Sequence, residues 1–225
     1  MNKLEGKRIY GFGDSLVAGH YRMVGMLDHL AKKNHMTYIK YAVNGATVIP
    51  DIAKQLPHTD LVPHIALQIE RASDEMPDFI CFDGMTNDAY PLIIENYLGE
   101  ITEGFREEYD TTTFAGAFEN VCCQLRMKYK ESVILYICPH KMPTRDKRVQ
   151  ELLQSMVVKI CKKWSFPYLD MYHEGGINTC FDPMREAYSY NEKNQMNGGN
   201  GTHLNEEGYE RFYTPQIEAK LLNYC

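Results

Sequence analysis

The sequence predicts an α/β domain of three layers, in which helices cover both faces of a mostly parallel sheet. Strand-like and helix-like segments alternate along all 225 residues, and helical connections between strands imply right-handed crossovers and parallel pairing. Two predicted strands, Asp78–Asp83 and Ser132–Cys138, are nearly continuous apolar runs, as is typical of strands that are buried on both faces. A mass of 26.0 kDa fits one large domain, residues 1–225, better than two small ones.

The elements follow one another as five β/α units. The first strand, Lys7–Gly13, ends at glycines, and Val17–Lys33 carries apolar residues at helical spacing, with Asn34 as its terminator. The β-rich segment Thr37–Val43 is the second strand, and the two apolar runs named above are the third and fourth. The remaining expected elements are helices Leu61–Ser73, Thr113–Tyr129 and Asp146–Trp164, strand Pro167–Tyr172 and a closing helix, Glu206–Leu222.

Two long segments interrupt this rhythm. Ala89–Thr112 is an acidic connection, and Glu174–Gly201 is rich in glycine and asparagine. Loops of this length are uncommon in compact domains and are often functional, so we expect both to form walls or lids of a site.

Composition excludes several classes of partner. A net charge of -6, with no Lys/Arg cluster longer than a pair, argues against nucleic acid and anionic membranes. No segment has the length of a signal peptide or a transmembrane helix. Seven cysteines, an odd number without a CxxC pair, signal neither a disulfide framework nor zinc. We expect a cytoplasmic protein with no metal and no cofactor, and the sequence leaves open whether it forms a homo-oligomer.

Polar and small residues follow the predicted strands. Ligands of open α/β sheets bind beyond the carboxyl ends of the strands, so these positions are the candidate site. The first strand, within "IYGFGDSLVAG", leads into an acid and a hydroxyl where the next helix begins. In chain order the segments are Gly13-Asp14-Ser15, Asn44–Thr47, Gly84–Asp88 and Pro139-His140-Lys141, followed by Asn200–Leu204 before the last helix.

Four of these blocks together resemble the SGNH (GDSL-type) hydrolase family of esterases and lipases: "GDSL", a glycine after the second strand, "TND", and "GTHLNEEGY" near the C-terminus. Each block is weak alone, but they occur in the family's order and span nearly the whole chain. The resemblance implies that Ser15 is the nucleophile, that Gly45 and Asn87 help to form the oxyanion hole, and that His203 is the general base. We therefore predict a flavodoxin-like, three-layer α/β/α fold with a five-stranded parallel sheet of strand order 2-1-3-4-5.

The residue types suit these roles. A serine on a tight strand-to-helix turn is lifted out of the sheet, and its hydroxyl is a poor nucleophile until a neighbouring base accepts its proton. The N–H groups of Ser15 and Gly45 and the amide of Asn87 would supply three oxyanion donors. A phosphate-binding turn fits less well, because Leu16 stands where GxGxxG needs a third glycine and no GK[ST] occurs.

Two positions depart from the family's pattern. Met85 replaces the glycine usually found two residues before the block-three asparagine, and Asn200 replaces the triad acid three residues before the histidine. A neutral amide can orient an imidazole but cannot offset its charge, and such a swap costs about 10⁴-fold in kcat in serine proteases. Three explanations stay open: a Ser-His pair oriented by Asn200 or a backbone carbonyl, an acid from elsewhere such as Asp182, or a chain that has lost most activity.

We predict a serine esterase that forms an acyl-enzyme and acts on small acyl groups, such as acetyl on a carbohydrate; the substrate class rests on family analogy. Candidate substrate contacts are His140, Met85 and Tyr188, although a satisfied histidine is at least as good an interpretation of His140. Asp14 and Asp88 are expected to accept backbone N–H groups. The competing functions are a non-catalytic module that binds acylated or glycosidic ligands, and a flavodoxin-type nucleotide binder.

Overall fold

A computed structural model shows five parallel strands in the order β2-β1-β3-β4-β5, which confirms the predicted topology. The structure describes residues 2–20, 23–55, 63–190 and 198–225. The strands are β1 (Arg8–Phe12), β2 (Thr37–Lys40), β3 (Phe79–Phe82), β4 (Val133–Cys138) and β5 (Tyr168–Asp170). The central strands β1, β3 and β4 are almost wholly buried, as their apolar sequences predict.

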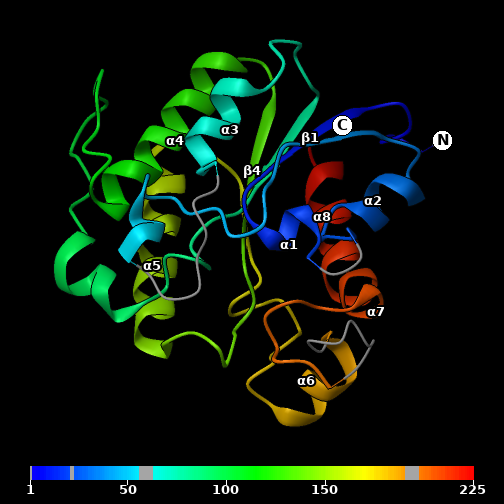
Figure 1. Cartoon of the computed structure of the whole chain (residues 1–225). Coiled ribbons are helices and arrows are strands. Elements are labelled where there is room, and N and C mark those ends of the chain that lie inside the picture. Colours follow the sequence, from blue (N-terminus) through cyan, green and yellow to red (C-terminus); the bar gives the residue numbers. More distant parts are fainter. Residues whose placement is uncertain (1, 21–22, 56–62, 191–197) are drawn as a thin grey trace.

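Helices cover both faces of the sheet (Figure 1). One face carries α3 (Ile65–Arg71), α4 (Phe114–Lys128) and α5 (Lys147–Lys163), and the other carries α1 (Ser15–Ala18), α2 (Asp28–Lys33) and α8 (Thr214–Leu222). The expected start of the third helix at residues 61–62 lies outside the described residues. The carboxyl ends of the strands point toward the lower part of Figure 1, where α6 (Asp182–Tyr188) lies.

The first helix departs most from its prediction. Instead of one helix over Val17–Lys33, the chain forms the short α1 and, after a loop, α2. Gly19 ends α1 with φ 84°, and a Cβ there would meet the backbone of Met23 and Val24 at 2.4 Å. Apolar periodicity alone does not reveal this break, because the loop residues Met26 and Leu27 are also buried in the core.

Two further segments differ from expectation. The predicted helix Glu206–Leu222 is built from α7 (Glu206–Gly208), the π-helical turn η3 (Tyr209–Tyr213) and α8. The predicted loop Ala89–Thr112 contains a π-helical turn, η2 (Ile93–Tyr97). A short 3-10 helix, η1 (Ile52–Gln55), also follows the second strand. Part of the loop Glu174–Gly201, residues 191–197, lies outside the described residues.

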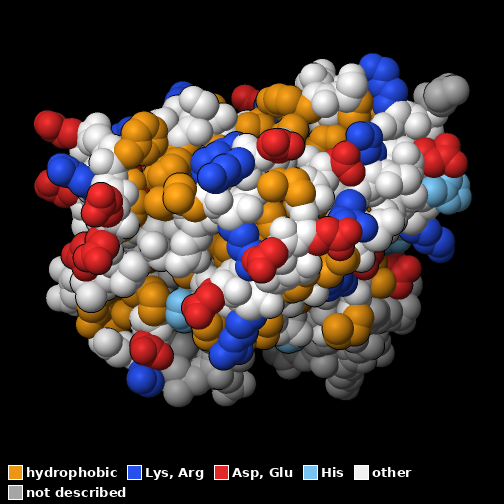
Figure 2. Space-filling view, turned by 90° about the horizontal axis from the view of Figure 1, so that it is seen from above, with side chains coloured by type: hydrophobic (Ala, Val, Ile, Leu, Met, Phe, Trp, Pro, Cys, Tyr) orange, Lys and Arg blue, Asp and Glu red, His pale blue; other side chains and the backbone are white. Residues whose placement is uncertain are grey.

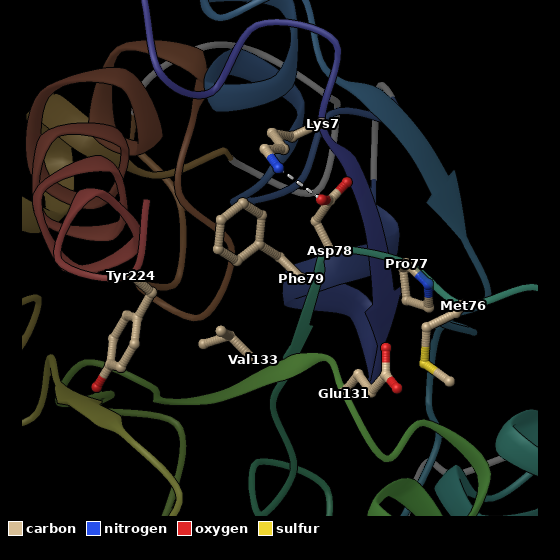
Figure 3. Close-up of a pocket in the computed structure, with 8 residues that line it drawn as sticks. All are labelled: Lys7, Met76, Pro77, Asp78, Phe79, Glu131, Val133 and Tyr224. Atoms are coloured by element: carbon tan, nitrogen blue, oxygen red, sulfur yellow. Dashed lines mark hydrogen bonds and ion pairs between the residues drawn. The ribbon is translucent and has the colours of Figure 1, made fainter.

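The amino ends of the strands form the face seen in Figure 2, where acidic and basic side chains are interspersed. A pocket of about 320 Å³ opens at this edge, between Lys7, Asp78, Val133 and Tyr224 (Figure 3). Lys7 Nζ lies 2.8 Å from Asp78 Oδ1 across it. Because Lys7, Asp78 and Val133 precede or begin their strands, this pocket lies at the opposite edge of the sheet from the predicted site.

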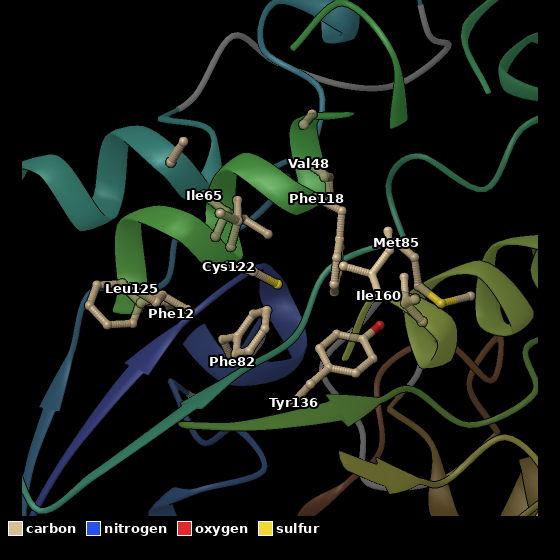
Figure 4. Close-up of a cluster of buried hydrophobic side chains, with 14 of the residues drawn as sticks. Phe12, Val48, Ile65, Phe82, Met85, Phe118, Cys122, Leu125, Tyr136 and Ile160 are labelled. Atoms are coloured by element: carbon tan, nitrogen blue, oxygen red, sulfur yellow. The ribbon is translucent and has the colours of Figure 1, made fainter. Parts of the chain in front are cut away.

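The larger hydrophobic core lies between the sheet and the α3–α4–α5 layer (Figure 4). Phe12, Phe82 and Phe118 pack there, together with Tyr136, whose hydroxyl donates to Gly84 O at 2.9 Å. Burial of each such aromatic side chain contributes about 1.5–3 kcal/mol. The core therefore holds the carboxyl ends of β1 and β3, which carry the Gly13-Asp14-Ser15 turn and the TND block.

Candidate active site

The Gly13-Asp14-Ser15 turn follows β1 and is held by α3. Gln68 on α3 accepts a hydrogen bond from Gly13 N–H and donates one to Gly13 O, each at 2.9 Å. Gly13 has φ 134°, and a Cβ there would overlap Asp83 Oδ1. Glycine is therefore required at this position by both backbone conformation and space.

Two buried carboxyl groups lie beneath Ser15. Asp14 caps α1 by accepting from Leu16 N–H at 2.9 Å, and Asp83 Oδ1 accepts from Asp14 N–H at 2.8 Å. Burial raises the pKa of Asp14, and burial together with the charge of Asp14 raises the pKa of Asp83 well above its ordinary value. Both side chains are fully buried. Their hydrogen bonds to the N–H groups of Asp14 and Leu16 hold the turn that carries Ser15.

Ser15 and His203 meet at the carboxyl edge of the sheet. Ser15 Oγ lies 2.8 Å from His203 Nε2, although the two residues are 188 positions apart in the chain. Both sit in largely buried surroundings, with Ser15 only 4 % exposed. A serine hydroxyl bonded to an imidazole nitrogen is the arrangement that activates a nucleophile.

A buried histidine holds the loop that carries His203. His140 Nε2 donates to Gly201 O at 3.0 Å, and its Nδ1 lies 2.8 Å from the Tyr213 hydroxyl. Thr179 Oγ1 also donates to Gly201 O, at 2.8 Å. Burial lowers the pKa of His140 to about 4. These contacts fit the satisfied histidine that the sequence left open, rather than a residue facing substrate.

His203 is a weak base in this setting. Burial is the main cause that lowers its pKa to about 3, and positive charge at His20, Arg145 and His140 adds to the effect. The His20 ring stacks on the His203 ring, with centroids 4.2 Å apart and planes inclined by 11°. The imidazole is thus held by Ser15 at one nitrogen and by a second ring against its face.

The TND block is tied to the loop that contains Gly45. Asn87 Nδ2 donates one hydrogen to Ala46 O at 3.0 Å, which leaves its second hydrogen for a ligand. Asp88 is fully buried and accepts from Val48 N–H at 2.9 Å and Ile49 N–H at 3.1 Å, while burial raises its pKa to about 7. Asp88 therefore accepts backbone N–H groups, as expected, and joins the TND block to the loop that contains Gly45.

Met85 replaces glycine at a position with a glycine-like backbone. Its φ is 145°, and Gly84 before it has φ 146°. Such a conformation costs a non-glycine residue about 1–3 kcal/mol. The Met85 side chain is 1 % exposed and packs in the core of Figure 4, and this burial contributes a similar 1.5–3 kcal/mol. Packing of the Met85 side chain in the core thus offsets the strain of its backbone.

Arg145, in the loop after β4, reaches back to the same block. Its Nε donates to Thr86 O at 2.7 Å, and its Nη2 lies 3.5 Å from Asn87 Oδ1. The guanidinium also lies 5.2 Å from the centre of the Tyr90 ring. Arg145 therefore places a positive charge beside the candidate oxyanion residue.

In the described part of the chain, the other predicted residues, Asn200, Asp182 and Tyr188, bond to or pack against residues other than Ser15 and His203. Asn200 is exposed, and its Oδ1 accepts from Thr202 N–H at 2.9 Å, so it shapes the turn that leads to His203. Asp182, the alternative acid, is 68 % exposed and pairs with Arg185 at 2.8 Å. Tyr188 packs edge-on against Phe212 at the end of α6.

Sequence reasoning missed three contributors to the site. Asp83 was assigned to the apolar run of the third strand, although it is the acid at the very end of that run. Arg145 stands five residues beyond His140, past the block considered after the fourth strand. The position of His20 could have indicated its role, since His20 lies two residues after the end of α1, the short helix that begins with Ser15.

The fold and the Ser15–His203 pair define a serine hydrolase site on a flavodoxin-like sheet. The chain matches the GDSL-like lipase/acylhydrolase family over residues 9–214 and belongs to this family of carboxylic ester hydrolases. The family resemblance noted in the sequence is thereby confirmed. No curated protein matches the chain.

Solved structures share the fold at low identity. A protein from Lactobacillus plantarum is 18 % identical, with a TM-score of 0.72 over 98 % of this chain and 96 % of the other. A member of the lipolytic protein G-D-S-L family from Veillonella parvula is 14 % identical, with a TM-score of 0.56 over 96 % of each chain. An active-site mutant of a family two carbohydrate esterase from Clostridium thermocellum, in complex with celluohexase, is 14 % identical, with a TM-score of 0.61 over 98 % of this chain and 64 % of the other.

Proposed function

We propose that this family member hydrolyses esters of small acyl groups, with Ser15 as the nucleophile and His203 as the general base. The observation that carries the proposal is the 2.8 Å contact between Ser15 Oγ and His203 Nε2. The distance lies within the range at which a base takes a proton from a nucleophile.

The reaction would run through an acyl-enzyme. Ser15 Oγ bonds to the ester carbonyl carbon as His203 Nε2 accepts the hydroxyl proton, and the carbonyl oxygen becomes an oxyanion. The N–H groups of Ser15 and Gly45 and the free hydrogen of Asn87 Nδ2 are the proposed donors to it. Collapse breaks the bond to the alcohol oxygen, which takes the proton from His203. Water then repeats the sequence and releases the acid.

Asn200 is proposed to stand in the place of the triad acid. The low pKa of His203 supports this, because burial above all, and then nearby positive charge, disfavours its imidazolium form, whereas a triad acid would favour it. The amide would act through the turn it forms with Thr202 N–H, one residue before the base. The site would then work as a Ser–His pair with limited basic strength.

The proposed substrates are acetyl-type esters of carbohydrates. The fold shared with a carbohydrate esterase is in keeping with this class. We retain the cytoplasm as the proposed compartment, since the seven cysteines are free thiols. No helix in the described part of the chain is long and apolar enough to cross a bilayer.

A fluorophosphonate probe tests the nucleophile. The probe should label the protein at Ser15, and peptide mass spectrometry should find the adduct there, since only a hydroxyl beside a base reacts readily. Ser15→Ala should abolish both labelling and the hydrolysis of p-nitrophenyl acetate. Labelling that persists in Ser15→Ala would sink the assignment, whereas Ser132→Ala, at a buried serine bonded to Pro77 O, should label normally.

The second candidate function is a non-catalytic binding module, and the observation that favours it is the low pKa of His203. With a pKa of about 3, His203 drives proton removal from Ser15 poorly. Such a protein would bind acetylated ligands with measurable affinity but show no turnover dependent on Ser15. A panel of p-nitrophenyl esters of graded chain length separates the two functions and sets the acyl length.

A further inference from the structure

A second pocket lies beside the proposed active site. It has a volume of about 310 Å³ and is walled by the loop after β4, the start of α5 and the segment around Asn178. Pro143 lines the pocket, and Pro143 and its neighbour Thr144 contact the turn that carries His203: Thr144 Oγ1 is hydrogen-bonded to Thr202 Oγ1, and Pro143 lies against Gly201. A pocket of this volume accommodates a group of monosaccharide size.

The pocket is cationic. Lys141, Arg145 and Lys147 all line it, and none of the lining residues in the described part of the chain is acidic. Lys147 is 83 % exposed and has a distant partner in Glu151, at 3.8 Å. Lys141 and Arg145 are half-buried, and the ion pairs found among the described residues involve neither of them.

Arg145 connects this pocket to the TND block. Its five N–H groups make three bonds to described residues, to Thr86 O, Thr144 O and Asn87 Oδ1. Within that part of the chain two donors remain, one on each terminal nitrogen. The same guanidinium that touches Asn87 therefore has donors left for a ligand in the pocket.

Aromatic rings lie under both cations. Lys141 Nζ is 5.1 Å from the centre of the Tyr172 ring, and Arg145 lies over Tyr90. These contacts hold the cations in place without neutralising them. Because no ion pair among the described residues neutralises these two charges, an anionic ligand in the pocket would supply their counter-charge.

We infer that this pocket binds an anionic group on the alcohol part of the substrate, a carboxylate in the first instance, through Arg145 and Lys141. The inference rests on the proposed function, because a small acyl group beside Ser15 leaves the alcohol part to reach the pocket. Arginine suits this role because its planar donors match a carboxylate.

Two acetyl esters of equal size test the inference: 4-acetoxybenzoate, which is anionic, and 4-acetoxybenzamide, which is neutral. The wild-type protein should show a kcat/KM for the benzoate about 10- to 100-fold above that for the benzamide, the range expected for a charged hydrogen bond. Arg145→Gln should reduce this ratio to near one. Lys141→Gln should reduce the ratio partly, because the Lys141 side chain makes no bond to the TND block. Lys32→Gln removes the same charge from an exposed side chain on α2 and should leave the ratio unchanged. 4-Acetoxybenzenesulfonate shows whether a sulfonate is accepted as well.

Equal kcat/KM values for the two esters in the wild-type protein, or a preference that survives in Arg145→Gln, would overturn the inference. Failure of the proposed function gives a different result, since neither ester would then be hydrolysed in a Ser15-dependent way. In that case calorimetric titration decides: tighter binding of the benzoate, lost in Arg145→Gln and Lys141→Gln, supports the anion pocket. Equal affinities for the two esters would reject it.

Discussion

Asn200 is proposed to stand in the place of the triad acid, and its replacement is the most direct test of the base. Asn200→Asp should raise esterase kcat by about tenfold or more, because a carboxylate stabilises the imidazolium that forms when Ser15 loses its proton. The carboxylate should also raise the pKa of His203 from its value of about 3, so the acid limb of the pH–kcat profile should move upward.

The control for this change is Asn2→Asp. Asn2 Oδ1 accepts from Leu4 N–H two residues on, as Asn200 Oδ1 accepts from Thr202 N–H, so the same charge enters the same kind of turn away from the site. An unchanged kcat in folded Asn200→Asp would show that the amide is not the limiting defect.

His20 is expected to position the base through ring stacking. His20→Ala should lower kcat about 3- to 10-fold, since aromatic pairs contribute about 0.5–1.5 kcal/mol beyond burial. His20→Phe keeps a ring against His203 and should retain most of the activity. His173→Ala, an exposed histidine bonded to Asp170, is the control in steady-state assays. Equal losses in the Ala and Phe variants would argue against stacking as the cause.

Among the secondary-structure elements, α3 holds the Gly13-Asp14-Ser15 turn through one side chain, that of Gln68. Gln68→Leu removes both bonds to Gly13 and leaves a buried N–H and a buried C=O unpaired. We expect a loss of about 2–4 kcal/mol in the free energy of unfolding, together with reduced kcat. Gln124→Leu on α4 is the matched control, because the buried Gln124 Oε1 has no hydrogen-bond partner in the described structure. Chemical denaturation of both variants measures the difference, and equal stability of the two would contradict this role.

Much of the fold was predictable because its strands and long helices have strong periodicity. The helix predicted over Asp146–Trp164 is observed as α5, one residue shorter at each end, with Asp146 as its cap. What escaped prediction depends on contacts between distant residues. The apolar residues after Gly19 continue a helical pattern although that glycine turns the chain, and α6 has no buried residue to signal it.

The same distinction applies to the site. The four family blocks placed Ser15 and His203 together, because parallel strands bring their carboxyl ends to one edge. The motifs did not reveal Arg145 and His20. The fold brings the Arg145 guanidinium to Asn87 and the His20 ring to His203, and no motif contains either residue. The part played by Asn200 stays a prediction, since its Oδ1 is seen bonded to Thr202 N–H.

For the whole molecule, His140 makes stability depend on pH. Its folded pKa of about 4 lies below the unfolded value of 6.5, so the unfolded chain binds the extra proton and stability is lost as pH falls from 6.5 toward 4. The contribution is about 3 kcal/mol for such a fully buried group. His140→Gln should remove it: urea unfolding from pH 4 to pH 8 should show the stability gap between wild type and variant widening as pH rises. A constant gap would mean that His140 does not titrate with unfolding.

The charge of Arg145 couples the occupant of its pocket to the proton on His203. Positive charge there lowers the pKa of the imidazole, so a bound anion that neutralises Arg145 should raise it. Linkage makes the effect reciprocal: protonation of His203 must strengthen anion binding by the same factor. The acid limb of activity is therefore a property of the enzyme and its substrate together, and it should lie at higher pH for an anionic ester than for a neutral one. An unreactive anion would correspondingly inhibit more strongly as the medium becomes more acidic.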